Sequence, residues 1–180
     1  VTCDLRLKRS EDNGYTWSDV EMIEEDLGHV PRCKPVRLQN GEILFGTEFT
    51  TWHSQIWGSA DDGESWGIRG FIPGEQNQHP SLIPRSDGSI LALIRPSGQH
   101  PNVLKSTSHD NGYTWSEVEI TENHCPYAAL DATLLQDGRI VMVWNNHPKH
   151  RNPLTLGLSQ DGGNTWLHKR DLIRGEGSFH

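Results

Sequence analysis

The sequence predicts an all-β protein built from repeated units of four antiparallel strands, and two series of turn motifs predict it. The first series consists of four octapeptides of the form S-x-D-[DNG]-G-x-[TS]-W, at residues 10–17, 59–66, 108–115 and 159–166. Their tryptophans lie at positions 17, 66, 115 and 166, so the steps between them are 49, 49 and 51 residues. A near-constant period of this length indicates a repeat architecture.

The second series consists of two-residue turn signals between apolar strands, Asn40-Gly41, Asp87-Gly88 and Asp137-Gly138. In the middle unit the two series predict strands over 80–84, 90–96, 103–108 and 115–120. No stretch shows sustained helical periodicity. Four strands per unit of about 50 residues are typical of a β-propeller blade, and the whole chain then holds about three and a half blades.

The chemistry of the octapeptides suits a hairpin turn. In the first one, Asp12 can accept hydrogen bonds from backbone N–H groups of the turn, and Gly14 supplies a positive φ. Trp17 is expected to begin the return strand and to pack beneath the turn. We therefore interpret the octapeptides as structural rather than catalytic.

Composition excludes several classes of function. The chain has 180 residues, 16 Lys and Arg against 24 Asp and Glu, and a net charge of −8, which disfavours nucleic acid as a partner. The longest apolar run, 90–94, is far shorter than the ~20 residues of a membrane span. Three cysteines, Cys3, Cys33 and Cys125, predict no disulfide framework. The histidine spacings predict no metal site, and nothing in the sequence predicts a cofactor.

The expected topology sorts the loops onto two faces of the propeller. The octapeptides share one face with the Gly turns, and the remaining loops lie on the other face, which we call the channel face. Eight of the ten histidines are expected there: His29, His53, His79, His100, His124, His147, His150 and His180. The channel face is therefore predicted to be the working face, although imidazoles are also tolerated in solvated loops.

Aligning the units on their Gly turns brings two sets of residues into register on the channel face. Lys34, His79 and Asp131 directly precede the first strand of successive units, and Glu48, Arg95 and Asn145 follow each turn glycine by seven residues. Polar residues at strand ends are ordinary in solvated proteins. The functional hypothesis is a ring of convergent groups around the central channel.

We assign roles within this ring by chemistry. Asp131, Glu48 and His79 are the candidate catalytic residues, because carboxylates and imidazole perform acid and base chemistry. The candidate substrate-binding residues are Lys34, Arg95, Asn145, Arg151, Tyr127 and Trp52. Arg95 and Arg151 carry guanidinium forks that suit a sugar carboxylate, and Trp52 and Tyr127 suit stacking on a sugar ring.

The octapeptides resemble the Asp box, or BNR repeat, of the sialidase superfamily. Residues 78–95, 130–146 and 153–156 also resemble the BNR-repeat-like sialidase domain. The resemblance implies that 1–180 is part of a six-bladed propeller whose substrate is a carbohydrate. Sialidases use an arginine triad, a Tyr–Glu nucleophile pair and an aspartate acid, and Tyr127 is the tyrosine expected on the channel face.

These observations favour an exo-acting glycoside hydrolase for sialic acid or another acidic glycan, with Asp131 or Glu48 as acid or base and Arg95 on the anionic group. A non-catalytic glycan- or protein-binding propeller and a polysaccharide lyase stay open as alternatives. The start at Val1 and the incomplete blade count indicate a piece of a longer propeller or a half-ring that closes as a homodimer. They leave the compartment undetermined, because a missing N-terminus would hide a signal peptide.

Overall fold

The computed structural model describes residues 3–26, 28–49, 53–98 and 100–179. Over these residues the chain forms 15 strands and no helix. The described residues accordingly contain no helix that is long and apolar enough to cross a membrane.

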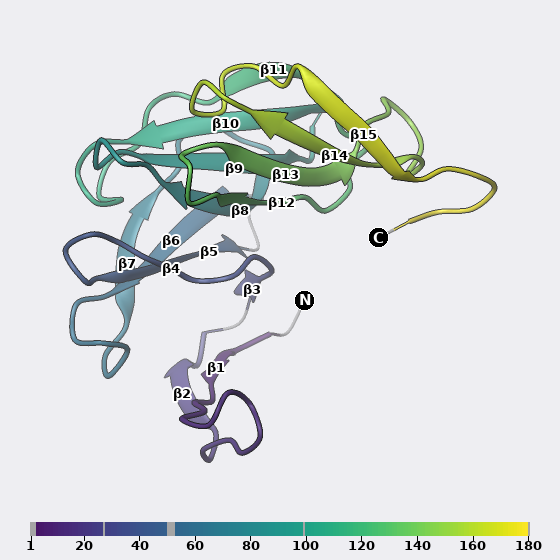
Figure 1. The fold of residues 1–180 in the computed structure, drawn as a ribbon. Helices are drawn as coiled ribbons and strands as arrows, with labels where there is room; N and C mark the ends of the chain where they lie inside the picture. Colours follow the sequence, from purple (N-terminus) through teal and green to yellow (C-terminus); the bar gives the residue numbers. More distant parts are fainter. Residues whose placement is uncertain (1–2, 27, 50–52, 99, 180) are drawn as a thin grey trace.

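The strands form four antiparallel sheets, which we call blades 1 to 4 (Figure 1). Blade 1 has two strands, β1 (Leu5–Leu7) and β2 (Glu21–Glu24). Blade 2 comprises β3 (Val30–Pro31), β4 (Val36–Arg37), β5 (Ile43–Phe49), β6 (His53–Ser59) and β7 (Gly67–Phe71). Blade 3 comprises β8 (Asn77–Pro84), β9 (Ile90–Pro96), β10 (Asn102–Ser108) and β11 (Glu119–His124). Blade 4 comprises β12 (Asp131–Leu134), β13 (Ile140–Asn145), β14 (Leu154–Ser159) and β15 (His168–Ile173).

This arrangement confirms the predicted all-β class and the four-stranded unit. Within blades 3 and 4 each strand pairs with the next in sequence order, which is the meander expected of a propeller blade. In blade 2 the innermost position is divided between β3 and β4, which both pair with β5.

The outer strand of blade 3 begins later than the sequence predicts. We expected it over 115–120, whereas β11 runs over Glu119–His124. A serine hydroxyl explains the delay, because Thr107 N donates to Ser116 Oγ (3.1 Å) while Ser116 N donates to Thr107 O (2.9 Å). The hydroxyl takes the place of a backbone carbonyl, so the regular ladder resumes only at Glu119.

The Gly turns are longer than the two-residue loops that the sequence predicts. In the first turn, Leu38 N donates to Glu42 O (2.8 Å), which leaves three residues in the loop. The positive φ of 90° falls on Gly41, and Asn40 is not among the residues with positive φ. A type I′ turn needs positive φ at both central residues, so these are three-residue loops with the glycine in the left-handed position.

The octapeptides, which we call Asp boxes, are closed by their own side chains. In the third box, Ser108 Oγ donates to Asp110 Oδ1 (2.9 Å) and accepts from Gly112 N (2.9 Å). Asp110 also accepts from Thr114 N (2.8 Å) and Thr114 Oγ1 (2.5 Å), and Trp115 Nε1 donates to Gly112 O (3.0 Å). The Ser and Asp bonds recur in all four boxes. The structural role predicted for the motif is confirmed.

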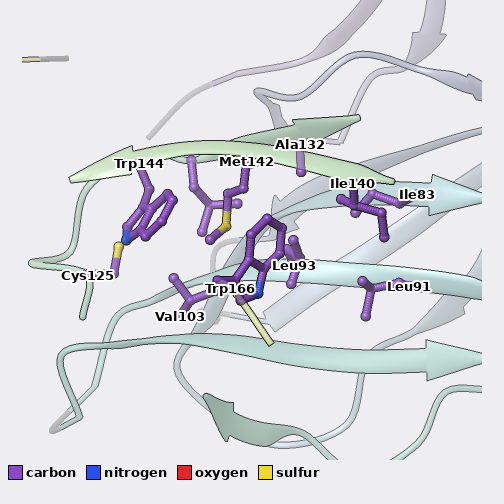
Figure 2. Close-up of a cluster of buried hydrophobic side chains, with 11 residues drawn as sticks. Ile83, Leu91, Leu93, Val103, Cys125, Ala132, Ile140, Met142, Trp144 and Trp166 are labelled. Atoms are coloured by element: carbon purple, nitrogen blue, oxygen red, sulfur yellow. The ribbon is translucent and has the colours of Figure 1, made fainter. Parts of the chain in front are cut away.

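The hydrophobic core lies between blades rather than within them. A cluster of eleven buried residues joins blades 3 and 4, and ten more join blades 2 and 3. In the first cluster the Trp144 and Trp166 ring centroids are 6.2 Å apart, and Figure 2 shows side chains of β13 pointing toward those of β9. Burial of apolar surface between the blades therefore holds the inner strands in fixed positions around the channel.

The inner strands are irregular at one end, and this irregularity shapes the channel face. In blade 2 the inner edge is interrupted between β3 and β4, where Pro31 and Pro35 lack the N–H groups that a continuous ladder needs. In blade 3 the register of β8 against β9 shifts between Gln78 and Ser81.

Candidate functional site

The strand register places the predicted site residues on the face opposite the Asp boxes. Ser108, which opens the third box, pairs with Ile90, the first residue of β9, which follows the Gly turn of the same blade. The boxes and the Gly turns therefore share one face, as predicted. Residues at the opposite ends of β5, β9 and β13 lie on the channel face, and inner strands β8 and β12 lie side by side there (Figure 1).

His79 lies at the centre of the channel face and is buried, with an exposed fraction of 6%. Its Nε2 is 2.9 Å from Glu48 Oε2, an approach that lies outside the angular range of a hydrogen bond. Its Nδ1 is 3.4 Å from Arg95 NH1. Gln78 Nε2 donates to the second oxygen, Glu48 Oε1. The structure thus brings the predicted residues Glu48, His79 and Arg95 into one contact group.

The environment of His79 favours the neutral ring. Burial, together with the positive charges of Arg95 and Arg32, lowers the pKa of His79 to about 4. Burial likewise lowers the pKa of Arg95, and the charges of Arg32 and Arg151 act in the same direction. Guanidinium groups keep their charge at any physiological pH, so the imidazole is neutral and the arginines are charged.

Asp131 forms a second group beside the first. Its Oδ1 accepts from Ser81 Oγ (2.6 Å) and from Ala132 N (2.8 Å), and Lys34 Nζ lies 3.4 Å from both carboxylate oxygens. Lys34 Nζ also donates to Ala132 O (2.8 Å). The Asp131 side chain is half exposed, so its carboxylate is oriented by the protein and still accessible to a ligand.

Cys33 lies between the two groups. Its thiol donates to His79 O (3.6 Å) and to Leu130 O (3.7 Å). Burial, together with the nearby Asp131 charge, raises the pKa of the Cys33 thiol to about 11. A thiol with this pKa is protonated at neutral pH and is not a nucleophile.

Arg32 belongs to the channel face, although sequence reasoning missed it. The residue is exposed, and its charge acts on both His79 and Arg95. It lies in the interruption between β3 and β4, two residues before Lys34. The alignment on Gly turns selected one residue before each inner strand, whereas the interruption between β3 and β4 places several residues on the channel face. The two prolines that flank it are the signal that could have found it.

The loops of blades 3 and 4 hold the remaining predicted residues. Tyr127 has a positive φ of 51°, its hydroxyl donates to Gly98 O, and Arg151 NH2 donates to Tyr127 O (3.1 Å). Asn145 is buried, and its Nδ2 donates to Pro153 O (3.2 Å). This hydrogen bond fixes the end of the loop that carries Arg151. Trp52 lies outside the described residues.

The histidines of the channel face do not form a metal centre within the described residues. No group of three or more His, Cys, Asp or Glu side chains there has an arrangement that would hold an ion. His29 is buried and packs against the rings of Phe49 and Trp57, with centroid distances of 5.1 and 5.4 Å. The His29 ring therefore takes part in packing, whereas other residues of the channel face form the contacts around His79.

Comparison with known proteins identifies the family. Residues 2–179 match the BNR repeat-like domain. The chain belongs to this family. The match spans the channel face as well as the Asp boxes, so it supports the resemblance drawn from the sequence motifs.

Several proteins that are similar to this BNR repeat-like domain are sialidases. A sialidase from Bacteroides fragilis (strain YCH46) is 24% identical over 197 residues, which cover 98% of this chain and 36% of that protein. The structure of the Hadza microbial sialidase Hz136 is similar with a TM-score of 0.84 and 22% identity, over 96% of this chain and 37% of that one. An intramolecular trans-sialidase from Ruminococcus gnavus has a TM-score of 0.75 and 20% identity, over 93% of this chain and 40% of that one.

These likenesses confirm the predicted fold, which is that of a sialidase-type propeller. The BNR repeat-like domain described here spans about a third of the length of its curated relative.

Proposed function

We propose that this domain supplies part of the active site of an exo-acting glycoside hydrolase that releases sialic acid or another acidic sugar. The observation that carries the proposal is a local cluster of cations. Around His79 and Asp131 the channel face gathers Arg32, Lys34, Arg95 and Arg151 beside the carboxylates of Glu48 and Asp131, in a chain whose net charge is −8.

The cationic groups suit an anionic sugar. Arg95 is half-buried, and its Nε is a buried donor with no partner among the described residues. The repulsion among Arg32, Arg95 and Arg151 is relieved when an anion binds between them. Guanidinium groups bind carboxylates through paired hydrogen bonds, so a sugar carboxylate is the ligand that fits this arrangement.

The two carboxylates suit different tasks in hydrolysis. Glycosidases combine one carboxyl group that exchanges a proton with the glycosidic oxygen and a second that stabilises positive charge at the sugar carbon, although sialidases place a tyrosine nucleophile in between. Asp131 is half exposed and we assign it the proton transfer. Glu48 is largely buried, with Gln78 of β8 donating to one oxygen and His79 Nε2 2.9 Å from the other, and we assign it the stabilisation of charge.

The structure favours hydrolysis over the lyase alternative. A lyase needs a base that reaches the proton beside the uronate carboxylate. His79, the imidazole at the centre of the site, is buried with Glu48 and Arg95 against its two nitrogens. A non-catalytic, glycan-binding propeller is distinguished from an enzyme by the experiment that follows.

The test compares acidic and neutral glycosides as substrates of the full-length protein. We expect release of the acidic sugar, no release from neutral aryl glycosides, and a loss in kcat/KM of about 100- to 1,000-fold in Arg95→Ala. Arg139→Ala is the matched control, because Arg139 is paired with Asp137 in a Gly turn on the opposite face. Binding of the acidic sugar without turnover would support the glycan-binding alternative instead. Equal rates in wild type and Arg95→Ala would overturn the proposal.

A further inference from the structure

The backbone at His79 is held in an unusual conformation. Its φ is 49°, in the left-handed region that few residues other than glycine adopt, and it lies within the register shift of β8. Pro80 follows it and packs against the backbone of Gly46 in blade 2. Strained residues persist where the surrounding structure holds them, and they concentrate at functional sites.

The neighbours of the ring determine which nitrogen carries the proton. Arg95 NH1 is always a donor, so His79 Nδ1, at 3.4 Å, faces it as an acceptor. A neutral ring then carries its hydrogen on Nε2, which is 2.9 Å from Glu48 Oε2. Gln78 Nε2 donates to the other oxygen, so two successive residues of β8 lie against one carboxylate.

We propose that His79 is a positioning residue, which Arg95 keeps in the Nε2–H tautomer and which orients the Glu48 carboxylate for the reaction. The inference rests on the proposed function and deepens it. It replaces the hypothesis, drawn from the sequence, that His79 is itself an acid or base. The Nε2–H is not aligned on Glu48 in this structure, and such contacts commonly tighten when a substrate binds.

Two further observations agree with this role. The ring has no exposed nitrogen through which to exchange a proton with a substrate, because it is buried between Glu48 and Arg95. Burial holds the pKa of His79 at about 4, so the ring stays neutral across the physiological range. An acid or base that works near neutral pH needs a pKa close to that pH.

The first test is independent of activity. Nitrogen-15 NMR of histidine-labelled full-length protein reports which ring nitrogen carries the proton, and His79→Gln identifies the His79 signal by its disappearance. We expect an Nε2–H tautomer that does not change between pH 5.5 and pH 8. An Nδ1–H tautomer, or a ring that titrates near its ordinary pKa, would overturn the proposal.

The second test uses kinetics on two variants. His79→Gln places an amide donor near the position of Nε2, whereas His79→Asn tolerates the left-handed backbone but is too short to reach Glu48. We expect His79→Asn to lower kcat by about 100-fold with little change in KM, and His79→Gln to restore most of that loss.

The outcomes separate the two proposals. Equal loss in both variants, together with a changed pH profile, would show that the imidazole acts as an acid or base. Wild-type rates in His79→Asn would show that Glu48 needs no positioning. If the wild-type protein turns over no acidic glycoside, the proposed function fails, while the NMR measurement still decides the tautomer and the role of Arg95 in setting it.

Discussion

The Asp-box face and the channel face are built from the same repeated unit, yet they use repetition in opposite ways. On the Asp-box face, the serine that opens each box and the aspartate two residues later are the same in all four boxes and make the same hydrogen bonds. On the channel face, the positions before the inner strands carry Lys34, His79 and Asp131. The residues that repeat are therefore those that each blade needs in order to fold. The residues that differ between blades are those that we expect to form one binding and reaction site.

The largest expected effect comes from the channel face. Asp131→Asn keeps an oxygen for Ser81 Oγ and Ala132 N but removes the acid or base, so kcat should fall by about 100- to 10,000-fold. Steady-state kinetics on an acidic glycoside measures this. Asp137→Asn, in a Gly turn on the other face, is the control and should keep the wild-type rate. If Asp131→Asn also keeps that rate, Asp131 does not transfer the proton.

The next largest expected effect tests the packing between blades 2 and 3 that holds His79 in place. A Cβ on Gly46 would lie 2.4 Å from Pro80 Cγ and 2.9 Å from Pro80 O, so Gly46→Ala should destabilise the protein by about 3 kcal/mol and displace His79. A Cβ on Gly67 meets nothing within 4 Å, so Gly67→Ala should leave stability unchanged. Chemical denaturation compares the two. Equal stabilities would show that β5 and β8 do not pack as described.

A smaller effect isolates the Asp-box face. Asp110→Ala leaves Ser108 Oγ, Thr114 N and Thr114 Oγ1 without their acceptor, which should lower the free energy of unfolding by about 1–2 kcal/mol. His109→Ala changes an exposed neighbour in the same box and should have no effect. The kcat of folded Asp110→Ala protein should equal that of wild type. A drop in kcat without loss of stability would contradict the division between the faces.

The smallest expected effect is a difference between the two faces in how their contributions to stability depend on pH. The folded-state pKa of His79 is lowered to about 4, so its stabilising contribution is complete above pH 6.5 and is lost as the pH falls toward 4. Hydrogen bonds from Thr16 and Ser65 lower the pKa of Asp12 and Asp61 to about 2, so their contribution is lost only below pH 3.8. Between pH 7 and pH 5.5 the free energy of unfolding should therefore fall by about 1 kcal/mol less in His79→Asn than in the wild-type protein.

Thermal unfolding at a series of pH values measures this difference, and Thr16→Val serves as the control for the Asp-box face. That variant removes the hydroxyl donor to Asp12 and should alter the pH dependence only below pH 4. Identical pH profiles for wild type and His79→Asn above pH 4 would show that His79 does not titrate as a buried neutral ring.

The same contrast explains how much the sequence predicts. The Asp boxes and Gly turns are local, so the blade count, the two faces and the register of Glu48, Arg95 and Asn145 follow from spacing alone. The late start of β11 depends on the Ser116 hydroxyl, which no periodic pattern reveals. Arg32 and the left-handed His79 depend on interruptions of inner strands by proline, where the regular repeat stops applying.

The central claim is that the divergent face of a repeated fold binds an anionic sugar. The most direct measurement compares hydrolysis, by the full-length protein, of an α-sialoside and of its carboxylate methyl ester. The cluster of Arg32, Arg95 and Arg151 predicts that esterification lowers kcat/KM by about 100-fold or more, and that Arg95→Ala abolishes most of the difference. Equal rates for acid and ester in the wild-type protein would contradict the claim.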